Sequence, residues 1–186
     1  LSPKLLEILT KKGFTVPSPI QYKAIPIALG GEDVIGIAQT GTGKTLAFGL
    51  PMIQIISRSK SKGLVLLPTR ELALQVEEAF QNIGRTAGLR TSVLIGGAPI
   101  HMQRQSLKRD PHIIIATPGR LNDHLTQTPR MLKDVTVLVL DEADRMLDMG
   151  FAPQIKTILQ TLPTERHTML FSATMPHEIV ALARSY

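Results

Sequence analysis

Short apolar, β-branched runs alternate along the chain with longer segments in which apolar residues recur at helical spacing. The run 135–140 is apolar at every position but one, as expected for a strand that helices cover on both faces. In segment 69–87 apolar side chains recur every three or four residues, which predicts a helix. This alternation predicts an α/β fold, a doubly wound parallel sheet with helices on both faces. The expected strands are 33–38, 63–67, 91–95, 112–116, 136–140 and 167–171.

The length and composition narrow the class of protein. The 186 residues are enough for one domain with a substantial core. The absence of cysteine excludes disulfides and thiolate metal sites. Because no apolar run is long enough to span a bilayer, we expect a cytoplasmic protein without a membrane partner, with a nuclear or organellar location also permitted. The chain begins at Leu1 rather than at Met, and we expect it to be a fragment.

The charge balance favours nucleic acid among possible partners. Lys and Arg total 21 against 15 Asp and Glu, a formal net charge of +6. Aromatic residues make up only 4% of the chain, so contacts to phosphate and sugar are expected rather than base stacking. The basic run 58–62 is interpreted as a solvated loop, with a binding patch as the alternative. The histidines are interpreted as surface or sheet-edge residues without zinc-ligand spacing; they are His101, His112, His124, His167 and His177.

A glycine-rich segment follows the first expected strand and opens a helical pattern. It consists of Ala38, Gln39, Thr40, Gly41, Thr42, Gly43, Lys44 and Thr45. Glycines let backbone N–H groups face an anion, Lys44 can reach terminal phosphates, and the Thr45 hydroxyl can bind Mg²⁺. Ala38 stands where this phosphate-binding motif ordinarily has its first glycine. The alternative is a strand–turn–helix joint whose glycines only form the turn.

An acidic segment directly follows the expected strand 136–140. It consists of Asp141, Glu142, Ala143 and Asp144. One carboxylate at the end of a buried strand can hold a Mg²⁺ ion that bridges nucleotide phosphates, and a second can activate water. The alternative is an acidic first helical turn that complements the helix dipole.

Together these motifs resemble the first, nucleotide-binding RecA-like lobe of DEAD-box RNA helicases. The segment 13–21 resembles the Q motif of that family, and Ala38 is the usual family residue at its position. Further matches occur in order at 68–73, at the doublet Gly96 and Gly97, at 117–120 and at 172–174. The resemblance implies that residues 1–186 form one helicase ATP-binding domain and that a second helicase lobe lies outside this chain.

The resemblance also implies roles for single residues. Phe14 and Gln21 would bind adenine, favouring ATP over GTP, although Phe14 could instead be a core residue and Gln21 a helix cap. Lys44, Asp141 and Glu142 would be catalytic, with Glu142 activating water and with Thr45 and Asp141 holding Mg²⁺ directly or through water. Contacts to RNA would come from Pro68, Thr69, Arg70, Gly97, Thr117, Gly119 and Arg120. The alternatives are that each arginine is a solvated surface charge or an intramolecular ion-pair partner, and that Thr117 and Pro118 simply start a helix.

A further set of residues would couple the state of the bound nucleotide to the separation of RNA strands. Ser172 and Thr174 are expected to bond to Asp144, although they could simply cap the next helix. The implied function is an ATP-dependent RNA helicase, and the alternative is an ATP-gated RNA clamp with little unwinding activity. The isolated lobe is expected to be monomeric and nearly inactive.

Overall fold

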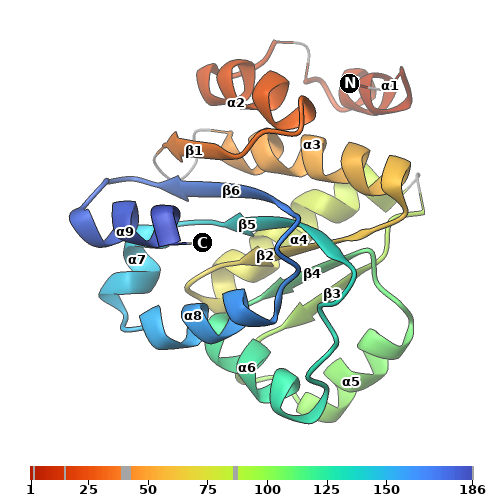
Figure 1. Ribbon diagram of the computed structural model, residues 1–186. Helices are drawn as coiled ribbons and strands as arrows, with labels where there is room; N and C mark the ends of the chain where they lie inside the picture. The colour runs from red at the N-terminus through yellow and green to blue at the C-terminus, as the bar shows by residue number, and fades with distance from the viewer. Residues whose placement is uncertain (2, 15, 39–42, 86–87, 186) are drawn as a thin grey trace.

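The computed structural model describes residues 1, 3–14, 16–38, 43–85 and 88–185 (Figure 1). In this part of the chain six strands form one sheet in the order β1-β6-β5-β2-β4-β3, and every neighbouring pair is parallel. The prediction of a parallel α/β fold is therefore confirmed. The strands are β1 (Val34–Ile37), β2 (Lys62–Leu66), β3 (Thr91–Leu94), β4 (Ile113–Ala116), β5 (Val135–Leu140) and β6 (His167–Ser172).

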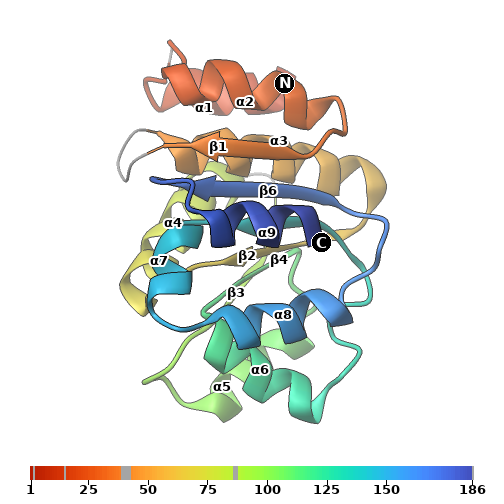
Figure 2. The same cartoon turned by 60° about the vertical axis from the view of Figure 1, so that its left-hand side comes forward.

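Helices cover both faces of this sheet, as Figures 1 and 2 show from two directions. One face packs against α1 (Pro3–Lys11), α2 (Pro19–Leu29), α3 (Lys44–Ser59) and α4 (Arg70–Gly84). The other packs against α5 (Ile100–Lys108), α6 (Pro118–Gln127), α7 (Ala143–Asp148), α8 (Ala152–Thr161) and α9 (His177–Ser185). Strand β5 serves both cores, because Val137 and Val139 belong to the first and Leu138 and Leu140 to the second.

The helix that follows the glycine-rich segment is fixed to the sheet by aromatic packing. Phe48 of α3 lies with its ring centroid 5.7 Å from that of Phe171 in β6. Gly36 of β1 makes room for this ring, since a Cβ atom there would lie 2.7 Å from Phe171. The start of α3 is thereby held beside the carboxyl ends of β1 and β6.

Two local predictions need correction. Helix α4 begins at Arg70 rather than at Thr69, which is its N-cap and accepts a hydrogen bond from the Leu72 N–H at 3.3 Å. The helix ends at Gly84, and residues 86–87 of the predicted range lie outside the described residues. The basic run 58–62 is not a loop, because α3 continues to Ser59 and β2 begins at Lys62. Lys60 makes the turn between them in a left-handed conformation, with φ 53°.

Candidate nucleotide and RNA site

The motifs that carry the candidate chemistry meet at the carboxyl edge of the sheet. Beyond four of the six strands the backbone bonding continues for one residue, because the N–H groups of Ala38, Leu67, Thr117 and Asp141 donate to carbonyl oxygens of neighbouring strands. Their N···O distances are 3.0–3.1 Å. The sheet itself therefore fixes the first residues of three motifs and, at Leu67, the residue directly before a fourth. Ligands of open parallel sheets bind at this edge.

Strand order separates the candidate residues into two groups. Apart from the two adenine candidates, which precede β1, the residues expected to bind nucleotide follow β1 and β5. Of the coupling residues, Asp144 follows β5, whereas Ser172 and Thr174 lie at and just beyond the end of β6, the strand between β1 and β5. Those expected to bind RNA follow β2, β4 and β3 on the other half of the sheet. The structure thus places the nucleotide candidates and the RNA candidates side by side along one edge.

Lys44 and Asp141 form a buried ion pair at the centre of the first group. The Lys44 ammonium lies 3.0 Å from the Asp141 carboxylate, and the two side chains are 6% and 3% exposed. The carboxylate also accepts a hydrogen bond from the Glu142 N–H at 2.9 Å. Burial raises the pKa of Asp141 above its ordinary value, although the charge of Lys44 acts in the opposite direction. The lysine at the start of α3 and the acid at the end of β5 thus belong to one site.

Glu142 is buried next to this pair in an uncommon backbone conformation. Its φ of 52° lies in the left-handed region, which costs a residue with a side chain about 1–3 kcal/mol. Such strain is found most often at functional sites, where surrounding structure enforces it. Between β5 and α7 it turns the chain so that two successive carboxylates leave the same strand.

Part of the phosphate-binding motif can be assessed in the structure. Gln39, Thr40, Gly41 and Thr42 lie outside the described residues. Gly43 has φ 82°, and a Cβ atom there would lie 2.8 Å from the side chains of both Ser18 and Gln21. A glycine is therefore required where the motif meets α2.

Gln21 connects α2 to the motif, and the helix-cap interpretation of this residue is confirmed. Its Oε1 accepts from the Ser18 N–H at 3.0 Å, and its Nε2 donates to the Gly43 carbonyl oxygen at 3.0 Å. Each end of a carboxamide has capacity for one more hydrogen bond, so adenine recognition stays a prediction. Phe14, 51% exposed, is not the core residue of the alternative interpretation. Phe14 and Gln21 line the same largely apolar cavity of about 270 Å³.

The expected contact between the segment after β6 and the acidic segment is present. The Asp144 carboxylate accepts from the Thr174 hydroxyl at 2.9 Å and from the Thr174 N–H at 3.2 Å. The Asp144 N–H donates to the Ser172 hydroxyl at 3.2 Å. Although partial burial raises the pKa of Asp144, the hydrogen bonds outweigh it, and the net shift is downward. Ser172, the last residue of β6, and Thr174, two residues further on, are therefore both bonded to Asp144 at the start of α7.

In the RNA half, the structure brings Arg70 and Gly97 together. With φ 81°, Gly97 approaches the Arg70 guanidinium so closely that a Cβ atom would overlap it. Arg70 is exposed, whereas Pro68 is buried. Thr117 and Gly119 lie at the start of α6, which has Pro118 in its first turn. The segments after β2, β4 and β3 thus form one strip along the edge, in which Arg70 and Gly97 are exposed and Thr117 and Gly119 are partly buried.

Arg120 is held by contacts within the protein. Its guanidinium donates to the Ala98 carbonyl oxygen at 2.9 Å and to Gln103 Oε1 at 3.3 Å. It also lies 3.6 Å from the Asp123 carboxylate. The intramolecular role left open for this arginine in the sequence is therefore present, and its RNA contact stays a prediction.

Sequence reasoning missed the residue that organises this half of the site. Gln103, 5% exposed, donates to the Ile95 carbonyl oxygen at 2.8 Å and bonds to His124 Nε2 at 2.9 Å. Interpretation of His124 as a surface residue was wrong, because it is 2% exposed. Burial, followed by the charge of Arg120, lowers the pKa of His124. Segment 103–106 departs from the Gln-x-x-Arg spacing usual in the family, and for that reason sequence reasoning assigned no role to Gln103.

The residues present fit a magnesium nucleotide. Mg²⁺ is ordinarily bound by one or two carboxylates together with water and substrate phosphates, and Asp141 with Thr45 can supply that donor set. No group of three or more His, Asp or Glu suited to a metal occurs in the part of the chain that the structure describes. Among the same residues, no helix is long and apolar enough to cross a membrane.

A parallel sheet with a buried lysine at the first crossover helix, which follows β1, and an acid at the end of β5, two strands away, defines a RecA-like nucleotide-binding lobe. A family model described as DEAD/DEAH box helicase matches residues 18–182. The chain therefore belongs to the DEAD/DEAH box helicase family.

Known proteins resemble the whole of this chain but are longer. The ATP-dependent rRNA helicase RRP3 of Debaryomyces hansenii is 50% identical over 100% of the chain and 39% of its own length. The ATP-dependent rRNA helicase rrp3 of Schizosaccharomyces pombe is 49% identical over 98% of the chain and 40% of its own length. Two solved structures match all of the chain. A DEAD box protein from Methanococcus jannaschii is 38% identical, with a TM-score of 0.93, and the match covers 52% of its length. The yeast DEAD-box splicing factor Prp28 is 33% identical, with a TM-score of 0.94, and the match covers 48% of its length.

Proposed function

We propose that this chain is the first, ATP- and RNA-binding lobe of an ATP-dependent RNA helicase. The observation that carries the proposal is the buried Lys44–Asp141 pair at the carboxyl edge, directly beside the strand ends that carry the RNA candidates. The names of the relatives favour a helicase over an ATP-gated clamp. The chain spans about 40% of the length of these curated relatives, and the second lobe belongs to the remainder.

The proposed chemistry assigns a task to each buried group. Lys44 neutralises negative charge on the terminal phosphates of ATP. This charge increases as the phosphoryl bond breaks. Bound Mg²⁺, held by Thr45 and Asp141 directly or through water, supplies further positive charge at the phosphates. Glu142 accepts the proton of the attacking water. Phe14 and Gln21 bind adenine, and the backbone of Gln39, Thr40, Gly41, Thr42 and Gly43, after Ala38, surrounds the phosphates.

RNA binding is assigned to the strip next to this site. Arg70, Gly97, Thr117, Gly119 and Arg120, with Pro68 and Thr69, contact the sugar–phosphate backbone. Such contacts position a strand and carry little sequence information. The hydrogen bonds of Asp144 to Ser172 and Thr174 couple the state of the bound nucleotide to the separation of RNA strands. The RRP3 relatives are named for ribosomal RNA, so we propose that RNA class as substrate and a location where it is handled, which in a eukaryotic cell includes the nucleus.

Substitution of Glu142 by Gln tests the catalytic assignment in the intact protein. The amide keeps the size of the side chain but accepts no proton, so turnover should fall about 10²–10⁴-fold, the usual contribution of a general base. ATP affinity should remain within about threefold, measured with a fluorescent ATP analogue. Unchanged turnover would remove Glu142 from the mechanism. Asp148→Asn, an exposed acid at the end of α7, is the control for loss of one negative charge.

A further inference from the structure

The opposite, amino edge of the sheet carries a dense group of cations that the proposed chemistry does not use. Lys62 begins β2, Arg90 directly precedes β3, and Lys133 lies two residues before β5. Lys62 is separated from the carboxyl end of β2 by four residues, or about 13 Å of strand. This edge therefore cannot be part of the nucleotide site.

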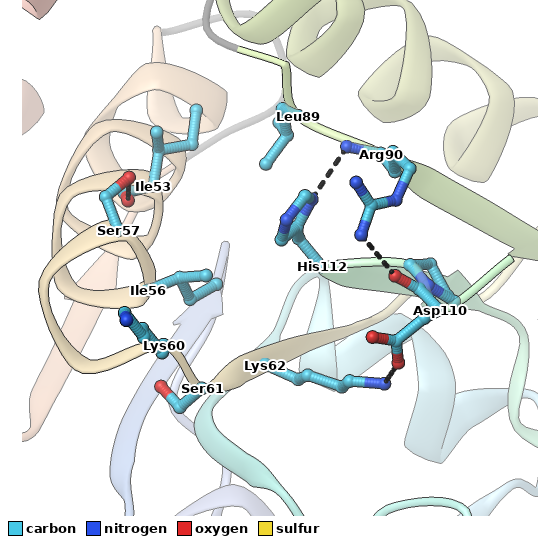
Figure 3. A pocket seen from close by; sticks show the side chains of 11 residues that line it. Ile53, Ile56, Ser57, Lys60, Ser61, Lys62, Leu89, Arg90, Asp110 and His112 are labelled. Atoms are coloured by element: carbon cyan, nitrogen blue, oxygen red, sulfur yellow. Dashed lines mark hydrogen bonds and ion pairs between the residues drawn. The ribbon is translucent and has the colours of Figure 1, made fainter.

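Two cavities adjoin at this edge and share Lys62, Asp110 and Pro111. Their volumes are about 270 and 570 Å³. Figure 3 shows the smaller one, with Lys62 reaching Asp110 and Arg90 lying beside His112. The amino-edge basic surface, as we call the rim of both cavities, contains Lys60, Lys62, Arg90, Arg104, Lys108, Arg130 and Lys133.

Positive charge on this surface greatly exceeds negative charge. Seven Lys or Arg side chains face two carboxylates, Asp110 and Asp134, among the described residues of the two linings. The difference of +5 compares with +6 for the whole chain. Asp110 is already paired with Lys62, and its main-chain carbonyl oxygen accepts from Arg90 at 3.0 Å. The net charge of the protein is therefore concentrated on one edge.

Individual cations here have unused hydrogen-bonding capacity. The Nε of Arg104 is buried and has no hydrogen-bond partner among the described residues. Lys60, Lys108, Arg130 and Lys133 are exposed. Guanidinium and ammonium groups with free N–H donors bind phosphate oxygens strongly. A polyanion on the outside of the protein would contact several of the four exposed side chains at once.

We propose that the amino-edge basic surface binds the sugar–phosphate backbone of an RNA duplex. No Phe, Tyr or Trp lines either cavity in the described part of the chain, so the stacking platforms that bind single strands are absent there. An A-form duplex, in contrast, is recognised by its shape and backbone. This inference rests on the proposed RNA-binding function and adds a second contact, which would hold structured RNA near the carboxyl edge and raise its effective concentration there.

Charge reversal at Lys108, Arg130 and Lys133 tests the proposal in the intact protein without nucleotide. We expect the triple Glu variant to bind a blunt, fluorescein-labelled RNA duplex at least about tenfold more weakly in fluorescence anisotropy. The slope of log affinity against log salt should fall by about two to three, since each lost phosphate contact contributes about 0.9. Affinity for a single strand of equal length should change less than about twofold. The triple Gln variant, with half the change in charge, should show an intermediate effect.

Control substitutions of Lys12, Lys23 and Lys156 by Glu change the charge equally at exposed positions outside both linings. Equal weakening by both triple variants would mean that overall charge alone acts, and would overturn the proposal. So would unchanged duplex affinity of the amino-edge variant, or an equal loss for the single strand. Absence of RNA-stimulated ATP turnover in the wild type would instead contradict the proposed helicase function. The duplex-binding comparison of the two triple variants would still decide whether the amino-edge basic surface binds RNA.

Discussion

At the scale of single residues, burial determines how strongly Lys44 and Asp141 interact at the carboxyl edge. Lys44 and Asp141 are almost inaccessible to water, yet each carries a charge that the other compensates. Breaking such a pair leaves one charge buried without a partner and commonly costs about 3–5 kcal/mol. A substitution of Lys44 therefore affects folding as well as nucleotide binding, and the two effects must be measured separately.

Lys44→Met should lower the free energy of unfolding by about 3–5 kcal/mol at neutral pH. The pKa of Asp141 is already raised, and loss of the lysine raises it further. Because the folded state then binds a proton more tightly than the unfolded state, stability falls as pH rises. The deficit should therefore shrink on acidification toward pH 4, in urea unfolding monitored by circular dichroism.

The double variant Lys44→Met, Asp141→Asn separates stability from function. Removing both charges should restore much of the lost stability, while ATP binding stays absent in the fluorescent-analogue assay. If the double variant were no more stable than Lys44→Met alone, the buried pair would not be the cause of the deficit.

At the scale of elements, buried hydrogen bonds connect the RNA half of the site. Gln103 of α5 bonds to the end of the β3 segment, to Arg120 and to His124 of α6. One carboxamide thus holds together three segments that contain, or lie next to, residues expected to bind RNA. A side chain that cannot hydrogen-bond there would leave several buried polar groups without partners.

Gln103→Leu should lower the free energy of unfolding by about 2–4 kcal/mol, because each buried polar group without a partner costs about 1–3 kcal/mol. RNA affinity should fall with it, whereas ATP affinity should stay within twofold, since β1 and β5 lie on the other half of the sheet. Urea unfolding and fluorescence anisotropy measure the two effects. Gln105→Leu, at an exposed position of the same helix, is the matched control and should change neither quantity.

Thr174→Val keeps the shape of the side chain but removes its hydroxyl bond to Asp144. Loss of one such bond should cost about 0.5–1.5 kcal/mol at pH 7. Since the folded-state pKa of Asp144 is lowered from 3.8, this contribution is present above that value and is lost as pH falls below it. The melting-temperature difference from wild type should therefore shrink between pH 5 and pH 3. A difference independent of pH would exclude the carboxylate as the partner that matters.

Periodicity predicted the elements well but not their arrangement. The alternation of apolar and polar positions placed each strand within about two residues, because hydrophobic patterns report burial directly. The order β1-β6-β5-β2-β4-β3 depends on crossovers that no local pattern encodes. For the same reason the sequence did not predict the direct Lys44–Asp141 ion pair, although the family resemblance implied that both residues are catalytic. The bonds of Gln103 and His124 join residues 21 positions apart and could not be predicted at all.

On the scale of the whole molecule, the two edges of the sheet have different properties. The carboxyl edge combines a buried ion pair, strained backbone at Glu142 and a partly exposed strip of residues expected to bind RNA. The amino edge carries most of the excess positive charge. The chain matches about 40% of its curated relatives and about half of the solved DEAD-box structures. The proposed function therefore requires the remaining part of the protein to complete the catalytic site.

The most direct test compares ATP turnover, with and without single-stranded RNA, for residues 1–186 and for the intact protein. An arginine supplied by a second lobe is commonly worth about 10³–10⁵ in rate, so RNA should stimulate turnover only in the intact protein, and the isolated lobe should be nearly inactive. Appreciable turnover by residues 1–186 alone would show that the catalytic site is already complete, and would contradict the division of the site between two lobes.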